Sequence, residues 1–396
     1  MSASPRCLIF NPYFPVLGGG ERYTVSLGEI ISESHDVTYA APYGLDPERV
    51  RAIGFPPIDV SILTEQDLPR ASLSYDLVVV VALDMPPATW AARSILVLQF
   101  PREVLGGRSR LRRRWLRARV RRYHVIVNSE FAREWTRRRW GIESQIVYPP
   151  VGLADTPAVQ KENLILAVGR FLGHEADQWN SKRQDALIAA FAQLPEELRA
   201  SWTLVLAGGA APSAEMDEAL ARLRRQASGL SVSFETNVAP ERLADLLARA
   251  RFFWHASGFE RPEDAPERAE HFGMATVEAM SAGAIPLVYA DGGQLEIVSP
   301  PWGRVWRSLS ELVEQAQTLM TASPAELDGL GAAARAASQP FGQSRFAREI
   351  RELLASIGAT RRPPAPARAA LERRWRGLRW AASRAATRAY RAVFRA

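Results

Sequence analysis

The stretch Glu270-His271-Phe272-Gly273-Met274-Ala275-Thr276-Val277-Glu278-Ala279-Met280-Ser281-Ala282-Gly283 decides the fold of the chain around it. Its apolar residues Met274, Val277 and Met280 recur at the spacing of one helix face. Glycine often follows the last residue of a helix, and the apolar run 284–288 after Gly283 predicts a buried strand. We therefore expect a loop, a short helix and then a strand.

The two glutamates of this stretch lie eight positions apart. Glu270 comes just before the expected helix, and Glu278 falls in its second turn. The backbone N–H groups of residues 272–274 lie at the helix N-terminus, where the helix dipole favours an anion. The segment therefore predicts a binding loop, although two surface glutamates on an ordinary βα unit would give the same pattern.

Glu-x7-Glu around Phe-Gly, followed by Glu-Ala-Met-Ser-Ala-Gly and a short strand, resembles the donor-binding motif of the retaining family-4 glycosyltransferases. The resemblance extends over roughly residues 7–356. It implies the GT-B fold, in which two Rossmann-like, doubly wound α/β domains face a central cleft.

Continuous apolar runs alternate with helical patterns in both halves of the chain, which predicts parallel sheets covered on both faces. We expect an N-terminal, acceptor-side domain over residues 1–151 and a linker over 152–162. A nucleotide-sugar-binding domain should follow over 163–357, and the resemblance implies that its last helix braces the first domain. Residues 358–396 read as a proline-containing linker and a basic amphipathic helical tail.

In the first domain, Gly18-Gly19-Gly20 separates an apolar strand from a helical pattern. Such a loop can be only a tight turn, but the resemblance implies that Gly19 and Gly20 lie against the donor diphosphate and the acceptor. Asp84 and Gln99 follow two further strands, and ligands of such sheets bind beyond the strands' carboxyl ends. Both are therefore expected on the acceptor side. Many relatives carry a histidine near Gln99, which itself cannot act as a base.

In the second domain, Val-Gly-Arg ends one strand at Arg170, and Lys182 precedes the next helical pattern. The resemblance implies that these two cations hold the donor diphosphate and act catalytically, together with Glu270. Lys161 and Lys182 are the only lysines, against 48 arginines, which suggests a specific point-charge role for Lys182. Arg183 could replace it. His255 ends another strand, either in the core or against the donor.

The resemblance also implies a set of donor contacts around the glutamate motif. Glu278 would accept both ribose hydroxyls, because a carboxylate offers two acceptor oxygens. Glu270 and the N–H groups of residues 272–274 would hold the sugar, with the glycine turn after the next strand touching it. The full donor-binding set is Gly19, Gly20, His271, Phe272, Gly273, Met274, Glu278, Gly292, Gly293 and Glu296.

Composition and charge exclude several other classes of protein. No run of 18 apolar residues predicts a membrane span, we expect no signal peptide, and the single cysteine, Cys7, excludes an intrachain disulfide. Histidine and cysteine show no metal-ligand spacing, so we expect no metal site. The net charge of +7 comes from two arginine-rich segments, 102–122 and 361–396. Each is a solvated surface or contacts an anionic membrane surface; nucleic acid is not expected.

Together these features predict a retaining, metal-independent hexosyltransferase without a cofactor, which moves a hexose from GDP-mannose or a UDP-hexose to a glycan or a lipid-linked acceptor. Glu-His-Phe-Gly resembles the motif of mannosyltransferases that use GDP-mannose. A role in cell-envelope polysaccharide synthesis, in the cytoplasm or peripherally on the inner face of the cytoplasmic membrane, would fit. The alternatives are a GT-B-fold sugar-nucleotide epimerase or hydrolase, and a catalytically silent sugar-nucleotide binder at a membrane surface.

Overall fold

The computed structural model describes residues 4–358 except 15–17, 46–47, 49, 51–54, 56, 103–109, 153–158 and 173–180. By their contacts, these residues form two compact units. The first unit holds the chain up to residue 128, residues 132–148 and the chain from residue 346 onward. The second holds residues 129–131 and 149–345. The predicted basic tail, 370–396, and most of the predicted linker, 152–162, lie outside the described residues.

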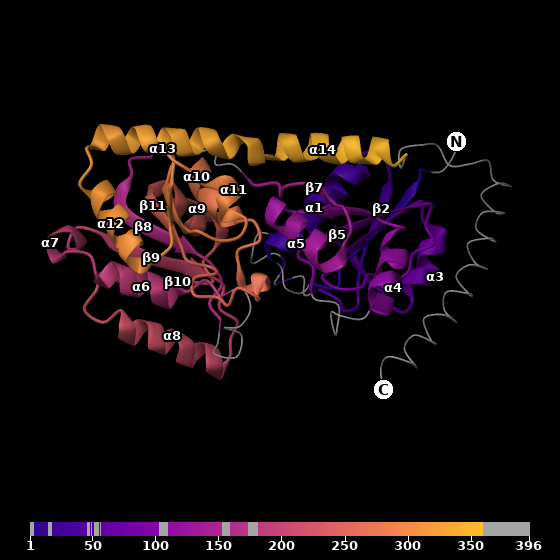
Figure 1. The fold of residues 1–396 in the computed structure, drawn as a ribbon, viewed down its shortest axis with the longest axis horizontal. Coiled ribbons are helices and arrows are strands. Elements are labelled where there is room, and N and C mark those ends of the chain that lie inside the picture. Colours follow the sequence, from indigo (N-terminus) through magenta and orange to yellow (C-terminus); the bar gives the residue numbers. More distant parts are fainter. Residues whose placement is uncertain are drawn as a thin grey trace. The chain divides into compact units, whose positions relative to one another are not determined.

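The first unit is built on a seven-stranded sheet in the order β3-β2-β1-β4-β5-β6-β7, with every strand pair parallel (Figure 1). Its inner strands consist almost entirely of buried aliphatic residues, as expected for a parallel sheet covered on both faces. The strands are β1 (Arg6–Phe10), β2 (Asp36–Ala41), β3 (Val60–Ile62), β4 (Leu77–Ala82), β5 (Arg93–Leu98), β6 (His124–Val127) and β7 (Gln145–Ile146).

Helices α1 (Gly19–Ser32) and α14 (Gln343–Ser356) supply apolar side chains to one core cluster of this sheet. From α1, Tyr23 packs edge-to-face on Phe346 of α14 with ring centroids 5.3 Å apart, and its hydroxyl donates to the carbonyl of Val147 at 3.3 Å. The last helix among the described residues is thus part of the first unit's core from Phe346 onward. Further α-helices described for this unit are α3 (Leu68–Ala71), α4 (Arg110–Val120) and α5 (Glu130–Trp140), of which the first two residues of α5 group with the second unit.

We predict that Phe346→Ala destabilises the first unit by about 3–5 kcal/mol, because the side chain is 1% exposed and its removal leaves a cavity in the core. The measurement is the midpoint of denaturant unfolding, followed by tryptophan fluorescence. The matched control is Arg348→Ala on the exposed side of the same helix, which should change stability by less than about 0.5 kcal/mol. Equal midpoints for the two variants would contradict this packing.

The second unit is built on a six-stranded parallel sheet in the order β10-β9-β8-β11-β12-β13. Helices α6, α8 and α12 pack on the core of one face, and α9 and α10 pack on the other (Figure 1). The strands are β8 (Glu162–Val168), β9 (Thr203–Gly208), β10 (Val232–Thr236), β11 (Ala250–His255), β12 (Ile285–Tyr289) and β13 (Arg304–Trp306). The helices are α6 (Gln184–Ala192), α7 (Glu196–Arg199), α8 (Ala214–Gln226), α9 (Pro240–Arg249), α10 (Met274–Ser281), α11 (Gln294–Ile297), α12 (Leu309–Met320) and α13 (Pro324–Ser338).

The predicted fold class, two Rossmann-like parallel α/β domains, is confirmed by these two sheets. The helix predicted to begin near Gly273 is α10, and the apolar run after it is β12. Two edge strands of three residues each, β3 and β13, escaped prediction because neither contains an apolar run. The chain also leaves the first unit after Tyr148, three residues before the expected boundary.

Candidate active site

The candidate active site of the second unit lies where the strand order of its sheet reverses. β8 and β11 are neighbours in the sheet. β9 and β10 lie beyond β8, whereas β12 and β13 lie beyond β11. Such a switch point opens a crevice beyond the carboxyl ends of the strands, where ligands of α/β sheets bind. The predicted residues follow the three adjacent strands β8, β11 and β12.

The N-terminus of α10 forms one wall of this site. Gly273 caps the helix with φ of 115°, in a region that L side chains rarely adopt, and its carbonyl accepts the N–H groups of Thr276 and Val277 at 3.0 and 3.2 Å. The first N–H groups of an α-helix have no partner inside the helix. The loop and the first turn therefore offer amide donors at the positive end of the helix dipole.

Glu270 lies at the centre of a buried charged cluster. Its carboxylate accepts from Lys182, which follows β8, and from Nε2 of His255 at the end of β11, at 3.1 Å. The side chains of Glu270 and Lys182 are only 19% and 20% exposed, and His255 is 4% exposed. Three residues distant in the sequence thus meet at one carboxylate.

The protonation states of the cluster follow from burial and charge. Burial opposes ionisation of Glu270, but the charge of Lys182 and the hydrogen bond from His255 outweigh it and hold the pKa of Glu270 well below its usual range. Burial lowers the pKa of His255 against the attraction of Glu270, and it lowers the pKa of His271 to about 4. At neutral pH both imidazoles are therefore neutral, while Glu270 is ionised.

A neutral His255 that donates from Nε2 to the ionised carboxylate has an acceptor at Nδ1. This atom is buried and has no hydrogen-bond partner among the described residues. The sequence left open whether His255 belongs to the core or to the site. The ring is buried in the strand and bonded to Glu270, whereas its contact with the donor stays a prediction.

Lys182 reaches Glu270 because residue 169 is a glycine. A Cβ on Gly169 would lie 2.4 Å from Cγ of Lys182, so any side chain there would displace the lysine. Arg170 comes next and is exposed, and its carbonyl accepts from Nε2 of Gln184 at 3.2 Å. Arg183, the alternative to Lys182, is instead paired with Asp185 and Glu260 at 3.1 Å each, so it links the start of α6 to the loop after β11.

The glycine turn after β12 packs against the loop that carries Glu270. The N–H of Gly293 donates to the carbonyl of Glu270 at 2.8 Å, and a Cβ on Gly292 would lie 2.1 Å from the same oxygen. Close approach of two backbones therefore explains both glycines, and the N–H of Gly293 is already engaged. The predicted contact of these two glycines with the donor sugar stays a prediction.

The carboxylate of Glu296 has a different environment from the one predicted. Its two oxygens accept the N–H groups of Glu130 and Phe131 at 2.8 and 2.9 Å, two residues that group with the second unit. Phe131 also stacks on His271, with ring centroids 6.4 Å apart. These contacts give Glu296 a structural role, and its predicted contact with the donor stays a prediction.

Comparison with known proteins supports the prediction made from the motif. Residues 154–301, which include Lys182, Glu270 and Glu278, match the model of the family described as glycosyl transferases group 1. This part of the chain is therefore similar to the group 1 glycosyltransferases. The chain is also similar to a curated protein of Mus musculus, GDP-Man:Man(3)GlcNAc(2)-PP-Dol alpha-1,2-mannosyltransferase, with 29% identity over 209 residues. The human protein of the same name is 30% identical over 208 residues.

These matches cover 48% of this chain and only 39% of each of the two curated relatives. Matches to solved structures cover more of this chain than the matches to curated proteins do. HepE of Anabaena, in complex with UDP and glucose, gives a TM-score of 0.68 at 19% identity, over 89% of this chain and all of HepE. WaaG, described as a glycosyltransferase of lipopolysaccharide biosynthesis, gives 0.59 at 18% identity over 87% of this chain and 99% of WaaG. The fold is therefore GT-B.

In the first unit, two predicted residues lie side by side. A Cβ on Gly20 would lie 2.1 Å from Nε2 of Gln99, a buried nitrogen without a hydrogen-bond partner among the described residues. Gly19 begins α1, and Gly18 before it donates its N–H to the carboxylate of Glu21 at 2.8 Å. This loop therefore forms the N-terminus of α1 at the sheet's own switch point, between β1 and β4.

The other first-unit prediction, Asp84, is exposed after β4. Burial and then the charge of Asp84 raise the pKa of Tyr13 to about 12, so the phenol stays protonated beside the carboxylate. Sequence reasoning did not select Tyr13. It also missed Gln294, which is fully buried beside Gly273 with neither side-chain polar atom bonded within the described residues. A polar residue after a glycine pair gives no indication of such burial.

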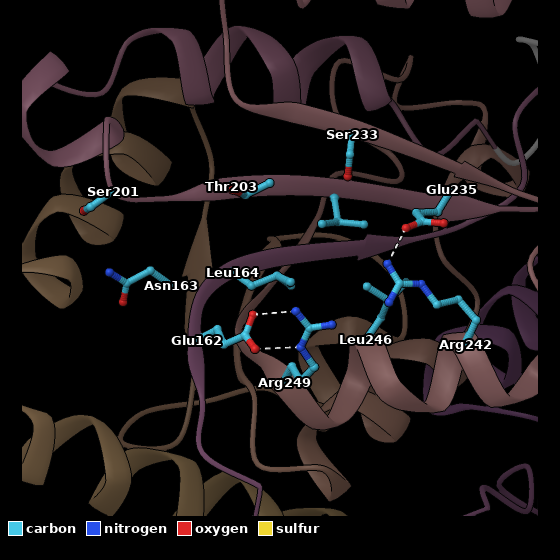
Figure 2. Close-up of a pocket in the computed structure, with 11 residues that line it drawn as sticks. Glu162, Asn163, Leu164, Ser201, Thr203, Ser233, Glu235, Arg242, Leu246 and Arg249 are labelled. Atoms are coloured by element: carbon cyan, nitrogen blue, oxygen red, sulfur yellow. Dashed lines mark hydrogen bonds and ion pairs between the residues drawn. The ribbon is translucent and has the colours of Figure 1, made fainter.

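A separate pocket of about 370 Å³ lies on the sheet face beside α9 (Figure 2). Its charged residues neutralise one another: Arg249 binds Glu162 through two bonds of 2.7 Å, and Arg242 binds Glu235 at 2.6 Å. None of the candidate active-site residues lines it. We regard this pocket as a polar surface depression.

No helix among the described residues is both long and apolar enough to cross a membrane. Within the same residues, no group of three or more histidine, cysteine, aspartate or glutamate side chains is placed to hold a metal ion.

Proposed function

We propose that this chain is a retaining glycosyltransferase that moves a hexose from a nucleotide-diphosphate sugar to an acceptor. The observation that carries the proposal is the meeting of Lys182, Glu270 and His255 with the N-terminus of α10 at the sheet's switch point. A cation, amide donors and a carboxylate are the groups that a diphosphate linked to a sugar requires.

Each group has a role in the proposed reaction. Lys182 and Arg170 bind the diphosphate and neutralise the negative charge that grows on it as it departs, which is electrostatic stabilisation where charge develops. The amides of residues 272–274 and Glu270 hold the sugar, and Glu278 accepts the ribose hydroxyls. The acceptor attacks from the face of the leaving group, and the β-phosphate helps to remove its proton, so no side chain acts as nucleophile.

The donor is GDP-mannose or a UDP-hexose. GDP-mannose is favoured by the motif Glu270-His271-Phe272-Gly273 and by the curated relatives, whose name includes GDP-Man. A UDP-hexose is favoured by the fold relative HepE, which was solved with UDP-glucose. Both donors carry the same diphosphate and differ in base and hexose, so the cluster around Lys182 suits either one.

The acceptor is a glycan or a lipid-linked sugar, in keeping with the PP-Dol in the name of the curated relatives. Basic side chains support an acceptor or a membrane with negative charge. Arg114, Arg117 and Arg121 are exposed on or just after α4, and Arg137 and Arg138 are exposed on α5. Each arginine near an anionic surface contributes about 1 kcal/mol. A peripheral position on the inner face of the cytoplasmic membrane would use these groups.

The donor site is tested by thermal unfolding with a panel of nucleotide sugars, in the parent and in Glu278→Ala. We expect one donor to stabilise the parent, by about 2.7 kcal/mol at a hundredfold excess over Kd, and to lose this effect in the variant. Glu314→Ala, an exposed glutamate on α12, is the control and should keep the response. A panel that includes GDP-mannose, UDP-glucose and UDP-galactose but stabilises neither protein would overturn the proposal.

Turnover of the identified donor then separates the alternative functions. Transfer to a glycan or lipid-linked acceptor is expected. Conversion of the donor at the same rate without any acceptor would identify an epimerase or hydrolase. Donor binding without turnover under any condition would identify a silent binder. This alternative is favoured by Gln99, because its amide cannot act as a base on the acceptor side.

A further inference from the structure

Lys161 is one of only two lysines in a chain with 48 arginines, and the proposed reaction does not use it. It directly precedes β8 and is partly buried. Its ammonium lies at the C-terminal end of α10, the helix whose N-terminal end forms a wall of the candidate active site.

The ammonium of Lys161 binds the carbonyl that ends α10. Its Nζ donates to the carbonyl of Ala282 at 2.7 Å, and Arg335 of α13 donates to the same oxygen at 3.2 Å. Ala282 is the C-cap residue of α10, where carbonyls lack partners inside the helix and carry the negative end of the dipole. Two cations from two different elements thus bind one helix end.

Close packing of glycines brings the second cation into reach. A Cβ on Gly331 of α13 would lie 2.7 Å from the carbonyl of Gly283, the residue after the cap of α10. Gly283 has φ of 86°, which turns the chain sharply into β12. One helical turn beyond Gly331, Arg335 then reaches Ala282.

The charges around Lys161 are mostly positive. Arg335 of α13 and Arg251 of β11 both face the ammonium of Lys161. Arg251 is paired with Asp328 at 3.2 Å, and it also donates to the backbone carbonyl of Lys161 at 3.1 Å. Burial, and then these two arginines, lower the pKa of Lys161 to about 8. An arginine at this position would stay charged at any pH, whereas a lysine can lose its proton.

We propose that Lys161 is a positioning residue for the candidate active site, because with Arg335 it fixes the carbonyl end of α10 and so sets the place of Glu278 and of the amide donors at the other end. α10 has eight residues, so the two ends are roughly 12 Å apart along one rigid element. This inference rests on the proposed function only for the identity of the ligand that the helix serves.

The first test is hydrogen exchange of the amides of α10 in the full chain. Lys161→Met keeps the length of the side chain and removes its charge and donors, and we expect exchange in residues 274–281 to become about tenfold faster. Exchange in α8, on the opposite face of the sheet, should be unchanged. Lys161→Arg should restore protection, and Arg335→Met should reproduce the loss if Lys161→Met fails to fold. Unchanged protection of α10 in both methionine variants would overturn the proposal.

The second test is isothermal titration of GDP and UDP into the same variants. Lys161→Met should lower the affinity for whichever diphosphate the parent binds by about 3- to 10-fold, and Lys161→Arg should restore this affinity. Parent-like affinity in Lys161→Met would overturn the positioning role. If the parent binds neither diphosphate, the proposed function fails, while hydrogen exchange still decides whether Lys161 orders α10.

A pH profile distinguishes this ammonium from a merely structural side chain. The pKa of about 8 in the folded chain lies below the ordinary value of 10.5, so the unfolded chain binds more protons between these pH values. The free energy of unfolding of the parent, relative to Lys161→Met, should therefore rise from pH 8 to pH 10.5 and be constant below pH 7. If this difference in the free energy of unfolding does not change between pH 8 and pH 10.5, the ammonium is not held among these cations.

Discussion

Lys182→Met will lower the turnover of the transferase by about 10²- to 10³-fold, the effect of removing one donor that stabilises a developing negative charge. Lys182 is the cation of the buried cluster, and its side chain passes over Gly169 toward Glu270. The loss should appear mainly in kcat, because the charge on the diphosphate grows as the bond to the sugar breaks. The measurement is release of the nucleoside diphosphate with donor and acceptor both saturating.

Two further variants make this result specific. Arg170→Ala should lose activity to a similar degree if the exposed guanidinium closes on the same diphosphate. Arg225→Met, on the exposed end of α8, removes one positive charge from the same unit and should leave turnover unchanged. Parent-like turnover in both Lys182→Met and Arg170→Ala would refute the assignment of these cations.

Glu270→Gln will lower turnover by about 10²-fold and yet tighten the binding of the free nucleoside diphosphate by about tenfold. The reason is competition, because the carboxylate of Glu270 already neutralises Lys182 in this structure. A diphosphate must displace that carboxylate before it can use the lysine charge. The amide of glutamine keeps the size of the side chain but removes the competing charge, so Lys182 becomes available at no electrostatic cost.

The opposite changes of binding and turnover are what distinguish this prediction. Titration calorimetry with GDP and UDP gives the affinity, and the turnover assay uses the complete donor, whose sugar loses its contact with the carboxylate. Glu263→Gln, an exposed glutamate of the same loop, is the matched control and should change neither quantity. Weaker diphosphate binding in Glu270→Gln would rule out competition between the two anions.

The sequence located the parts of the fold that depend on local pattern. The apolar spacing of Met274, Val277 and Met280 predicted α10, and its N-terminus lies where Gly273 indicated. Runs such as 77–82 and 164–168 predicted buried parallel strands because both of their faces need apolar cover. The short edge strands β3 and β13 were not predictable in this way, since each is defined by its neighbour in the sheet.

The sequence was less informative about contacts between distant segments. It selected Glu270 and Lys182 separately, but not their pairing across 88 residues or the hydrogen bond from His255. It predicted ligand contact for Gly292 and Gly293, but not that these glycines also allow the turn to approach the backbone of Glu270. Glu296 likewise accepts from amides of residues 130 and 131, some 165 positions earlier.

The chain by itself determined its fold class, the family it resembles and the stretch around which the candidate site forms, because helical and strand periods and a spaced pair of glutamates are local properties. Only the tertiary structure decided what those residues do to one another. It placed Glu270 between a lysine and a histidine, which sets its charge, and it placed Lys161 at the far end of α10. Charge, burial and hydrogen bonding depend on what lies within a few ångströms, and the fold brings those neighbours together from distant parts of the chain.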